Sequence, residues 1–180
     1  MKAPRGFTVL ELVIVVAVAG IIAAIVIPAL VRARVAANES ATIGDIRTVL
    51  SAQAAYRTAN AGYFDSNLAC LVGPSAGCIP GYPTSAPTFL DSTLASQVAK
   101  AGYNRYFQGG PAPPIIPPNA SLTSTLTYRY DATPTIGGVT GVRGFAADAS
   151  ERICFTLDGA SVPPGAPFPE QLPANCRQLR

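Results

Sequence analysis

The sequence predicts an α+β protein in which a long N-terminal α-helix, half transmembrane and half amphipathic, packs on a small antiparallel β-sheet of three to four strands. Three observations predict this class. An apolar run without charges lies near the start, helical periodicity continues beyond it, and the last third alternates as strands do. Charged residues make up only 13% of the 180 residues, against about 25% in an average soluble domain.

The first element is the unbroken apolar run at residues 12–31. As a helix, these 20 residues extend about 30 Å, which matches the hydrocarbon core of a bilayer. Lys2 and Arg5 precede the run, and the positive-inside rule then keeps the N-terminus in the cytoplasm. We therefore expect a single-pass membrane segment with the rest of the chain on the far side.

Two residues are unusual for a plain membrane anchor. Glu11 lies at the edge of the apolar run, where a carboxylate is costly in lipid, and Pro28 lies inside it, where it removes a helix hydrogen bond. A secretory signal peptide would have a shorter apolar region. A generic signal anchor explains the length of the run but gives Gly6, Glu11 and Pro28 no role.

The segment Gly6-Phe7-Thr8-Val9-Leu10-Glu11 resembles the class III signal of type IV prepilins and type II secretion pseudopilins, a resemblance that covers residues 1–34. It implies a leader peptide at residues 1–6, cleavage between Gly6 and Phe7 by the membrane-embedded prepilin peptidase, and N-methylation of Phe7. It also implies that Glu11 is the family's assembly glutamate and that Pro28 is its helix-loosening proline. Residues 7–31 would then form first a transmembrane helix and later the core of a filament.

The chemistry of these residues suits the implied roles. Gly6 has no side chain, so a peptidase can approach its backbone closely. Cleavage would leave Phe7 with a free amine that is cationic near neutral pH. Glu11 of a neighbouring copy would be an anion at the same depth, and two charges that are costly apart become tolerable together. We interpret this pair as a device that sets the register between helices.

The amphipathic continuation is predicted at residues 32–61. Its apolar positions recur at helical steps or their multiples: Val35, Ile43, Ile46 and Leu50. Its polar positions are Arg32, Arg34, Glu39, Asp45, Arg47 and Arg57. The helix is expected to end at about Ala59, because Asn60-Ala61-Gly62 is typical of a C-terminal stop.

The globular head is predicted at residues 62–180. Its first part is rich in Pro, Gly, Ser and Ala, with a short helix at 90–101 and an exposed Pro-rich loop at 111–118. The later part predicts a three-stranded antiparallel meander, with 103–107 as a candidate fourth strand. The three strands are expected at 126–130, 141–146 and 152–157. This meander also resembles the heads of pilin-like proteins.

The four cysteines indicate two disulfides in an oxidising compartment, a periplasm or the cell exterior. Proximity along the chain favours Cys70–Cys78 and Cys154–Cys176, although four cysteines allow three connectivities. The second bridge would close a C-terminal loop, and similar loops in pilins form part of the exposed surface. A zinc site is disfavoured because the chain has no histidine and no Cys-x-x-Cys pair.

No catalytic chemistry is predicted. Without histidine, the usual Ser-His-Asp and Cys-His arrangements are excluded, and no phosphate-binding or dinucleotide fingerprint is present. Asp148, Glu151 and Asp158 are interpreted as solvated turn acids rather than a calcium site. Asn119-Ala120-Ser121 fits the N-glycosylation pattern, which is common by chance. We expect no cofactor and no metal, and no basic run occurs that would bind nucleic acid by itself, so no nucleic-acid partner is predicted.

The resemblance implies a structural subunit of a type IV pilus that supports adhesion, twitching motility or DNA uptake. One alternative is a pseudopilin of a type II secretion system, and another is a membrane-anchored periplasmic binding domain that never polymerises. The implied partners are other copies of the chain or related pilins, the prepilin peptidase, an inner-membrane assembly platform and, before assembly, membrane lipid. The implied location is the bacterial inner membrane first and a periplasm-spanning or cell-surface filament afterwards.

Overall fold

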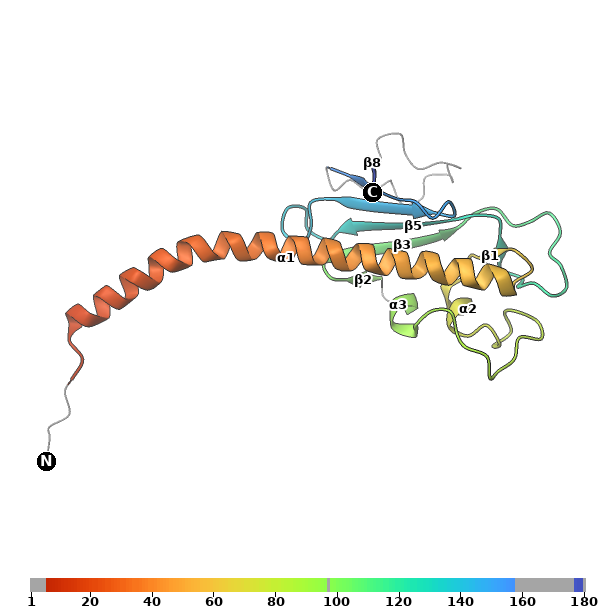
Figure 1. Ribbon diagram of the computed structural model, residues 1–180, viewed down its shortest axis with the longest axis horizontal. Coiled ribbons are helices and arrows are strands. Elements are labelled where there is room, and N and C mark those ends of the chain that lie inside the picture. The colour runs from red at the N-terminus through yellow and green to blue at the C-terminus, as the bar shows by residue number, and fades with distance from the viewer. Residues whose placement is uncertain (1–5, 97, 158–176, 180) are drawn as a thin grey trace, which may run out of the picture.

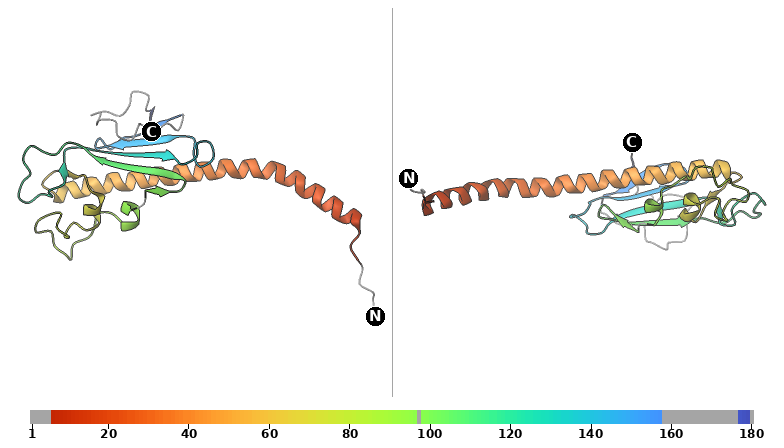
Figure 2. Two further views of the ribbon diagram at one scale, coloured as in Figure 1. Left: turned by 180° about the vertical axis from the view of Figure 1, so that it is seen from behind. Right: turned by 90° about the horizontal axis from the view of Figure 1, so that it is seen from below.

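The computed structural model describes residues 6–96, 98–157 and 177–179. It confirms the α+β class: a long helix, α1, lies along one face of an antiparallel sheet (Figure 1). The N-terminal half of α1 extends well beyond the head, so the molecule is a rod with a folded head at one end (Figure 2).

Helix α1 runs without a break from Val9 to Ala59. Its end agrees with the predicted stop, because the Asn60 N–H donates to the Tyr56 carbonyl at 2.9 Å and the Gly62 N–H to the Arg57 carbonyl at 3.0 Å. Ala61 and Gly62 then turn the chain away with φ values of 51° and 88°. Such positive φ values end helices, and glycine adopts them at least cost.

Pro28 lies inside α1 and does not end it. A proline has no backbone N–H, so one hydrogen bond of the helix ladder is missing there. The half of α1 that contains Pro28 curves, whereas the half that lies on the sheet is nearly straight (Figures 1 and 2). Curvature is the expected response of a helix to a lost ladder bond.

The main sheet of the described chain is antiparallel throughout, in the order β2-β3-β5-β6-β7-β8. Its strands are β2 Ala99–Lys100, β3 Tyr103–Gly109, β5 Tyr128–Pro134, β6 Gly144–Asp148, β7 Ile153–Thr156 and β8 Arg177–Gln178. A separate pair, β1 Phe64–Asp65 and β4 Ser124–Thr125, lies near the end of α1. Two short helices, α2 Leu68–Val72 and α3 Ser92–Ser96, precede the main sheet.

Several predicted boundaries are wrong. The strand expected at 126–130 starts at Tyr128 and continues to Pro134, because seven of its residues pair with β3. The helix expected at 90–101 is only α3, and its last residues form β2 instead. Strands β2 and β8 were not predicted, since a two-residue strand is too short to show alternation.

The core lies between the second half of α1 and the sheet. Ile46 and Leu50 are buried as predicted, and Ile43 is half-buried. Three tyrosines, Tyr56, Tyr103 and Tyr128, are fully buried between the layers. Glu39, which the sequence placed on the polar face of the helix, is instead 5% exposed, because it bonds to the head.

Candidate functional site

The first half of α1 is the largest exposed apolar surface of the described chain. All sixteen large apolar side chains from Phe7 to Val31 are at least 42% exposed. Full burial of such a side chain is worth about 1.5–3 kcal/mol relative to full exposure, so this surface favours an apolar environment that the described residues do not supply. By length and composition, α1 is apolar enough to cross a membrane.

The N-terminus of α1 is closed by a capping box. The Thr8 hydroxyl oxygen accepts from the Glu11 N–H at 3.2 Å, and Glu11 Oε2 accepts from the Thr8 N–H at 3.2 Å and from the Thr8 hydroxyl at 3.1 Å. These bonds satisfy two backbone N–H groups that a helix start otherwise leaves unpaired. Glu11 therefore supports its own helix, a local role that the sequence reasoning missed although the Thr-x-x-Glu spacing indicates it.

Gly6 and Gly20 are not required by the packing of the chain. A Cβ atom added at either position would meet no atom within 4 Å, and neither residue has a positive φ. Phe7 is 78% exposed next to Gly6. If glycine is needed at position 6, the need comes from outside the described structure.

The head is fixed to α1 at Asn38 and Glu39, where the β5–β6 connection crosses the helix. The Asn38 side-chain amide donates to the Thr140 carbonyl at 2.8 Å. The Glu39 carboxylate accepts from the N–H groups of Val142 and Arg143 at 3.0 and 3.1 Å and from Arg143 Nε at 2.8 Å. We call these contacts the basal clamp, because they lie where α1 leaves the head.

A second attachment lies further along α1. Asp45 forms ion pairs with Lys100, at 2.9 Å, and with Arg105, whose side chain is 3% exposed. Lys100 is on β2 and Arg105 on β3, so the pair fixes the sheet edge to the helix. The helix and sheet are thus joined by charged contacts as well as by the apolar core.

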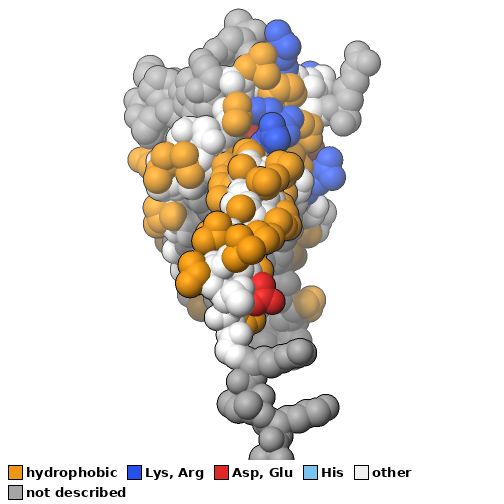
Figure 3. Space-filling model, turned by 90° about the vertical axis from the view of Figure 1, so that its left-hand side faces the viewer, with side chains coloured by type: hydrophobic (Ala, Val, Ile, Leu, Met, Phe, Trp, Pro, Cys, Tyr) orange, Lys and Arg blue, Asp and Glu red, His pale blue; other side chains and the backbone are white. Residues whose placement is uncertain are grey.

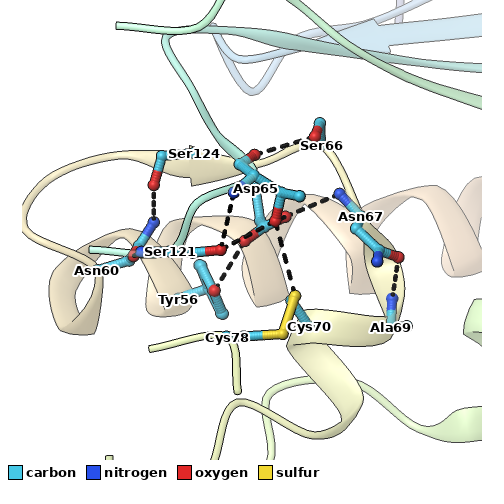
Figure 4. The surroundings of a disulfide bond; sticks show 11 residues. Tyr56, Asn60, Asp65, Ser66, Asn67, Ala69, Cys70, Cys78, Ser121 and Ser124 are labelled. Carbon is cyan, nitrogen blue, oxygen red and sulfur yellow. Dashed lines mark hydrogen bonds between the residues drawn. A yellow bond between two sulfur atoms is a disulfide. The ribbon is translucent and has the colours of Figure 1, made fainter. Parts of the chain in front are cut away.

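The Cys70–Cys78 disulfide is confirmed, and it lies beside a buried polar network at the far end of α1 (Figure 4). The carboxylate of Asp65, which is fully buried, accepts from the Tyr56 hydroxyl at 2.8 Å, the Thr123 hydroxyl at 2.7 Å and the Asn67 N–H at 2.8 Å. Burial, then the bond to Asp65, raises the pKa of Tyr56 above its ordinary value. Tyr56 thus remains a neutral hydroxyl that can donate to Asp65.

Two side-chain amides, one in α1 and one at its C-terminal cap, extend this network. Gln53 brackets the backbone of Asp65, donating to its carbonyl at 2.9 Å and accepting from its N–H at 3.1 Å. Asn60 donates to the Ser124 hydroxyl at 2.9 Å and accepts from the Ser121 N–H at 2.7 Å. The sequence analysis missed both, although Gln53, Tyr56 and Asn60 share one face of the helix at three- and four-residue spacing. The network joins the end of α1 to the start of the head.

The other predicted bridge is only partly within the described residues. Cys154, on β7, is disulfide-bonded. Its predicted partner Cys176 lies outside the described residues, as does Asp158. Within the described ranges, no three His, Cys, Asp or Glu side chains group closely enough to hold a metal ion.

Comparisons with known proteins bear on the N-terminus and on the greater part of the chain. Residues 1–27 match the family model of the prokaryotic N-terminal methylation motif. The chain is 29% identical over 126 residues to a type IV wide pilus major component, PilA4, of Thermus thermophilus. That alignment covers 69% of this chain and 95% of the relative. No solved structure matches the chain.

Proposed function

We propose that this chain, which matches the N-terminal methylation motif and is similar to a type IV pilus component, is a structural subunit of a type IV pilus-like filament. It polymerises through α1, and the head remains on the outside. The observation that carries this proposal is the exposed apolar half of α1, which lacks a partner in the described chain and is rigidly continuous with a folded head. A membrane can cover that surface first, and parallel copies of the same helix can cover it later.

Maturation is proposed to begin with cleavage between Gly6 and Phe7, followed by N-methylation of Phe7. Two observations support this. The motif model spans both residues, and the fold tolerates a side chain at position 6, so a requirement for glycine there fits recognition by a peptidase. The proposed partners are therefore a prepilin peptidase, an inner-membrane assembly platform and further copies of the chain.

Assembly is proposed to pair the Phe7 amine of one copy with Glu11 of another. Thr8 directs both of its bonds to Glu11 at Oε2, so within the described chain Oε1 is left to accept from an amine. Capping and pairing can thus coexist on one carboxylate. In the apolar contact between neighbouring helices, the two charges neutralise each other only when the helices are in the correct register.

The first test separates the charge of Glu11 from its capping role. Glu11→Val and Glu11→Gln are expected to reduce the yield of sheared filaments about tenfold or more, because the Phe7 amine then loses its ionic partner. Glu11→Gln keeps a side chain suited to the capping box, whereas the control Thr8→Ala removes the cap and keeps the charge. Thr8→Ala is expected to assemble. If Glu11→Gln forms normal filaments and Thr8→Ala forms none, the helix cap is what assembly needs. That outcome would refute the proposed pairing of Glu11 with the Phe7 amine.

Mass spectrometry of the native protein tests the function as a whole. Sheared surface filaments should contain subunits that begin with N-methylated Phe7. The same subunits confined to the cell envelope, with loss of protein secretion on deletion, would indicate the type II secretion pseudopilin instead. Subunits that keep Met1 and remain monomeric would contradict both filament functions and leave a membrane-anchored periplasmic domain. The similarity to a wide pilus component favours the surface filament.

A further inference from the structure

The end of the head that faces back along α1 is itself apolar. Three large side chains of the β5–β6 connection are exposed there, Ile136 at 56%, Val139 at 57% and Val142 at 49%. Leu157, which follows β7, is 56% exposed, and it lies at the same end because Thr156 pairs with Gly144 at the start of β6. We call these four residues the basal patch. Figure 3, which views the molecule from its N-terminal side, shows hydrophobic side chains on the head around the helix.

The basal clamp fixes the height of this patch above the apolar half of α1. Thr140 and Val142 bond to Asn38 and Glu39, so the β5–β6 connection cannot move along the helix. Asn38 follows Val31, the last residue of the apolar run, by seven residues, or about 10 Å of helix. The headgroup layer on each side of a bilayer is about 5–8 Å thick. When the apolar run lies in lipid, the patch therefore lies at the outer edge of the headgroups.

Among the described residues, the exposed charged side chains nearest the patch are basic. Arg32 and Arg34 are exposed on α1 between the apolar run and the clamp. The Arg143 side chain, next to the patch, is 34% exposed, whereas its partner Glu39 is buried beneath it. Figure 3 shows basic side chains grouped beside the helix at this end of the head. Apolar side chains flanked by arginines are the combination that binds a membrane surface containing anionic lipids.

We propose that the basal patch is a membrane-docking surface that rests on an anionic phospholipid bilayer while α1 spans it. Val139 and its neighbours contact the outer edge of the headgroup layer, and Arg32, Arg34 and Arg143 bind lipid phosphates. The inference rests on the part of the proposed function that places α1 in a membrane, and it adds a second, peripheral contact. Docking holds the unassembled head against the bilayer in one orientation, and incorporation into a filament must lift the patch off the lipid.

The absence of tryptophan from the sequence allows a direct test. Val139→Trp gives a single fluorescent reporter in the patch. Ile115→Trp is the matched control, since Ile115 is 80% exposed in the connection that leaves β3 at the opposite end of the head. Ile22→Trp reports on the transmembrane half of α1. Each full-length variant is placed in nanodiscs of phosphatidylethanolamine and phosphatidylglycerol at one chain per disc, with lipids brominated near the headgroup or deep in the acyl chain.

Shallow bromine is expected to reduce the emission of the Val139→Trp variant about twofold and to leave the Ile115→Trp variant unchanged. Replacing phosphatidylglycerol with phosphatidylcholine, or combining Arg32→Gln with Arg34→Gln, should weaken that quenching. Equal, weak quenching of both head reporters would overturn the proposal. A Val139→Trp reporter that is shielded from water only when several chains share a disc would also overturn the proposal. That result would mean that a second copy of the chain, not lipid, covers the patch.

The Ile22→Trp reporter separates this inference from the proposed function. Deep quenching of that variant without shallow quenching of Val139→Trp would refute only the docking surface. A lack of deep quenching would show that α1 does not span the bilayer, and both proposals would then fail.

Discussion

Glu39 is the residue at which α1 becomes part of the head. The residue is 5% exposed, and its carboxylate accepts hydrogen bonds from Arg143 and from the Val142 backbone. Burial raises the pKa of Glu39, but the hydrogen bonds and the positive charge of Arg143 together outweigh it, so the pKa lies below its ordinary value. The head is therefore held in place by an ionised carboxylate.

The lowered pKa of Glu39 predicts how the stability of the fold responds to acid. A carboxyl group whose pKa is lower in the folded state stabilises the fold fully above its unfolded value, 4.5 for Glu39, and the contribution is lost as the pH falls through the folded value. We expect the free energy of unfolding to drop below about pH 4.5, and Glu39→Gln to cost about 1–3 kcal/mol at pH 7 while flattening this dependence. Urea unfolding of the full chain in non-ionic detergent measures both.

Glu151→Gln is the control for this prediction, because Glu151 is exposed in the turn between β6 and β7. It should leave stability at pH 7 within about 0.5 kcal/mol of the parent. An acid response that is identical in the parent and in Glu39→Gln would show that another group is responsible.

At the scale of elements, the β5–β6 connection depends on a close approach at Gly141. A Cβ atom there would lie 2.0 Å from the Tyr103 hydroxyl oxygen, and that hydroxyl donates to the Arg143 carbonyl at 2.8 Å. Gly141→Ala is therefore expected to destabilise the head by about 1–3 kcal/mol through overpacking. Gly137→Ala, in the same connection, meets no atom within 4 Å and should change stability by no more than about 0.5 kcal/mol. Equal thermal midpoints for the two variants would contradict this account.

The elements differ in how far the sequence predicts them. The sequence predicts α1 and its end at Ala59 from local signals. The apolar periodicity lies within the helix itself, and the Asn60-Ala61-Gly62 stop directly follows its last residue. Strands β2 and β8 and the burial of Glu39 depend on partners far away in the chain. Arg143, for example, is 104 residues from Glu39. The N-terminal motif is local and was found, whereas the Asp65 network brings together α1, β1 and residue 123 and was missed.

For the whole molecule, the distribution of contacts predicts two parts of unequal stability. Every described residue from Gly6 to Arg34 is exposed, so contacts with the head contribute almost nothing to the stability of the first half of α1. In detergent micelles, urea should unfold the head together with the second half of α1, while about 20 residues of the first half stay helical in the apolar phase. Far-UV circular dichroism should therefore show a residual helical signal after the near-UV signal of the tyrosines is lost. Simultaneous loss of both signals would show that the two parts fold as one unit.

The unbroken passage of α1 from the apolar half into the head has a mechanical consequence. The described chain has no linker between the two halves of α1, so no flexible segment absorbs a force that is applied to the head. The force is borne by the backbone hydrogen bonds of α1 and by the contacts of Asn38 and Glu39 with the β5–β6 connection. A fibre built from such subunits would transmit tension along its axis and would turn each head only together with its own stem.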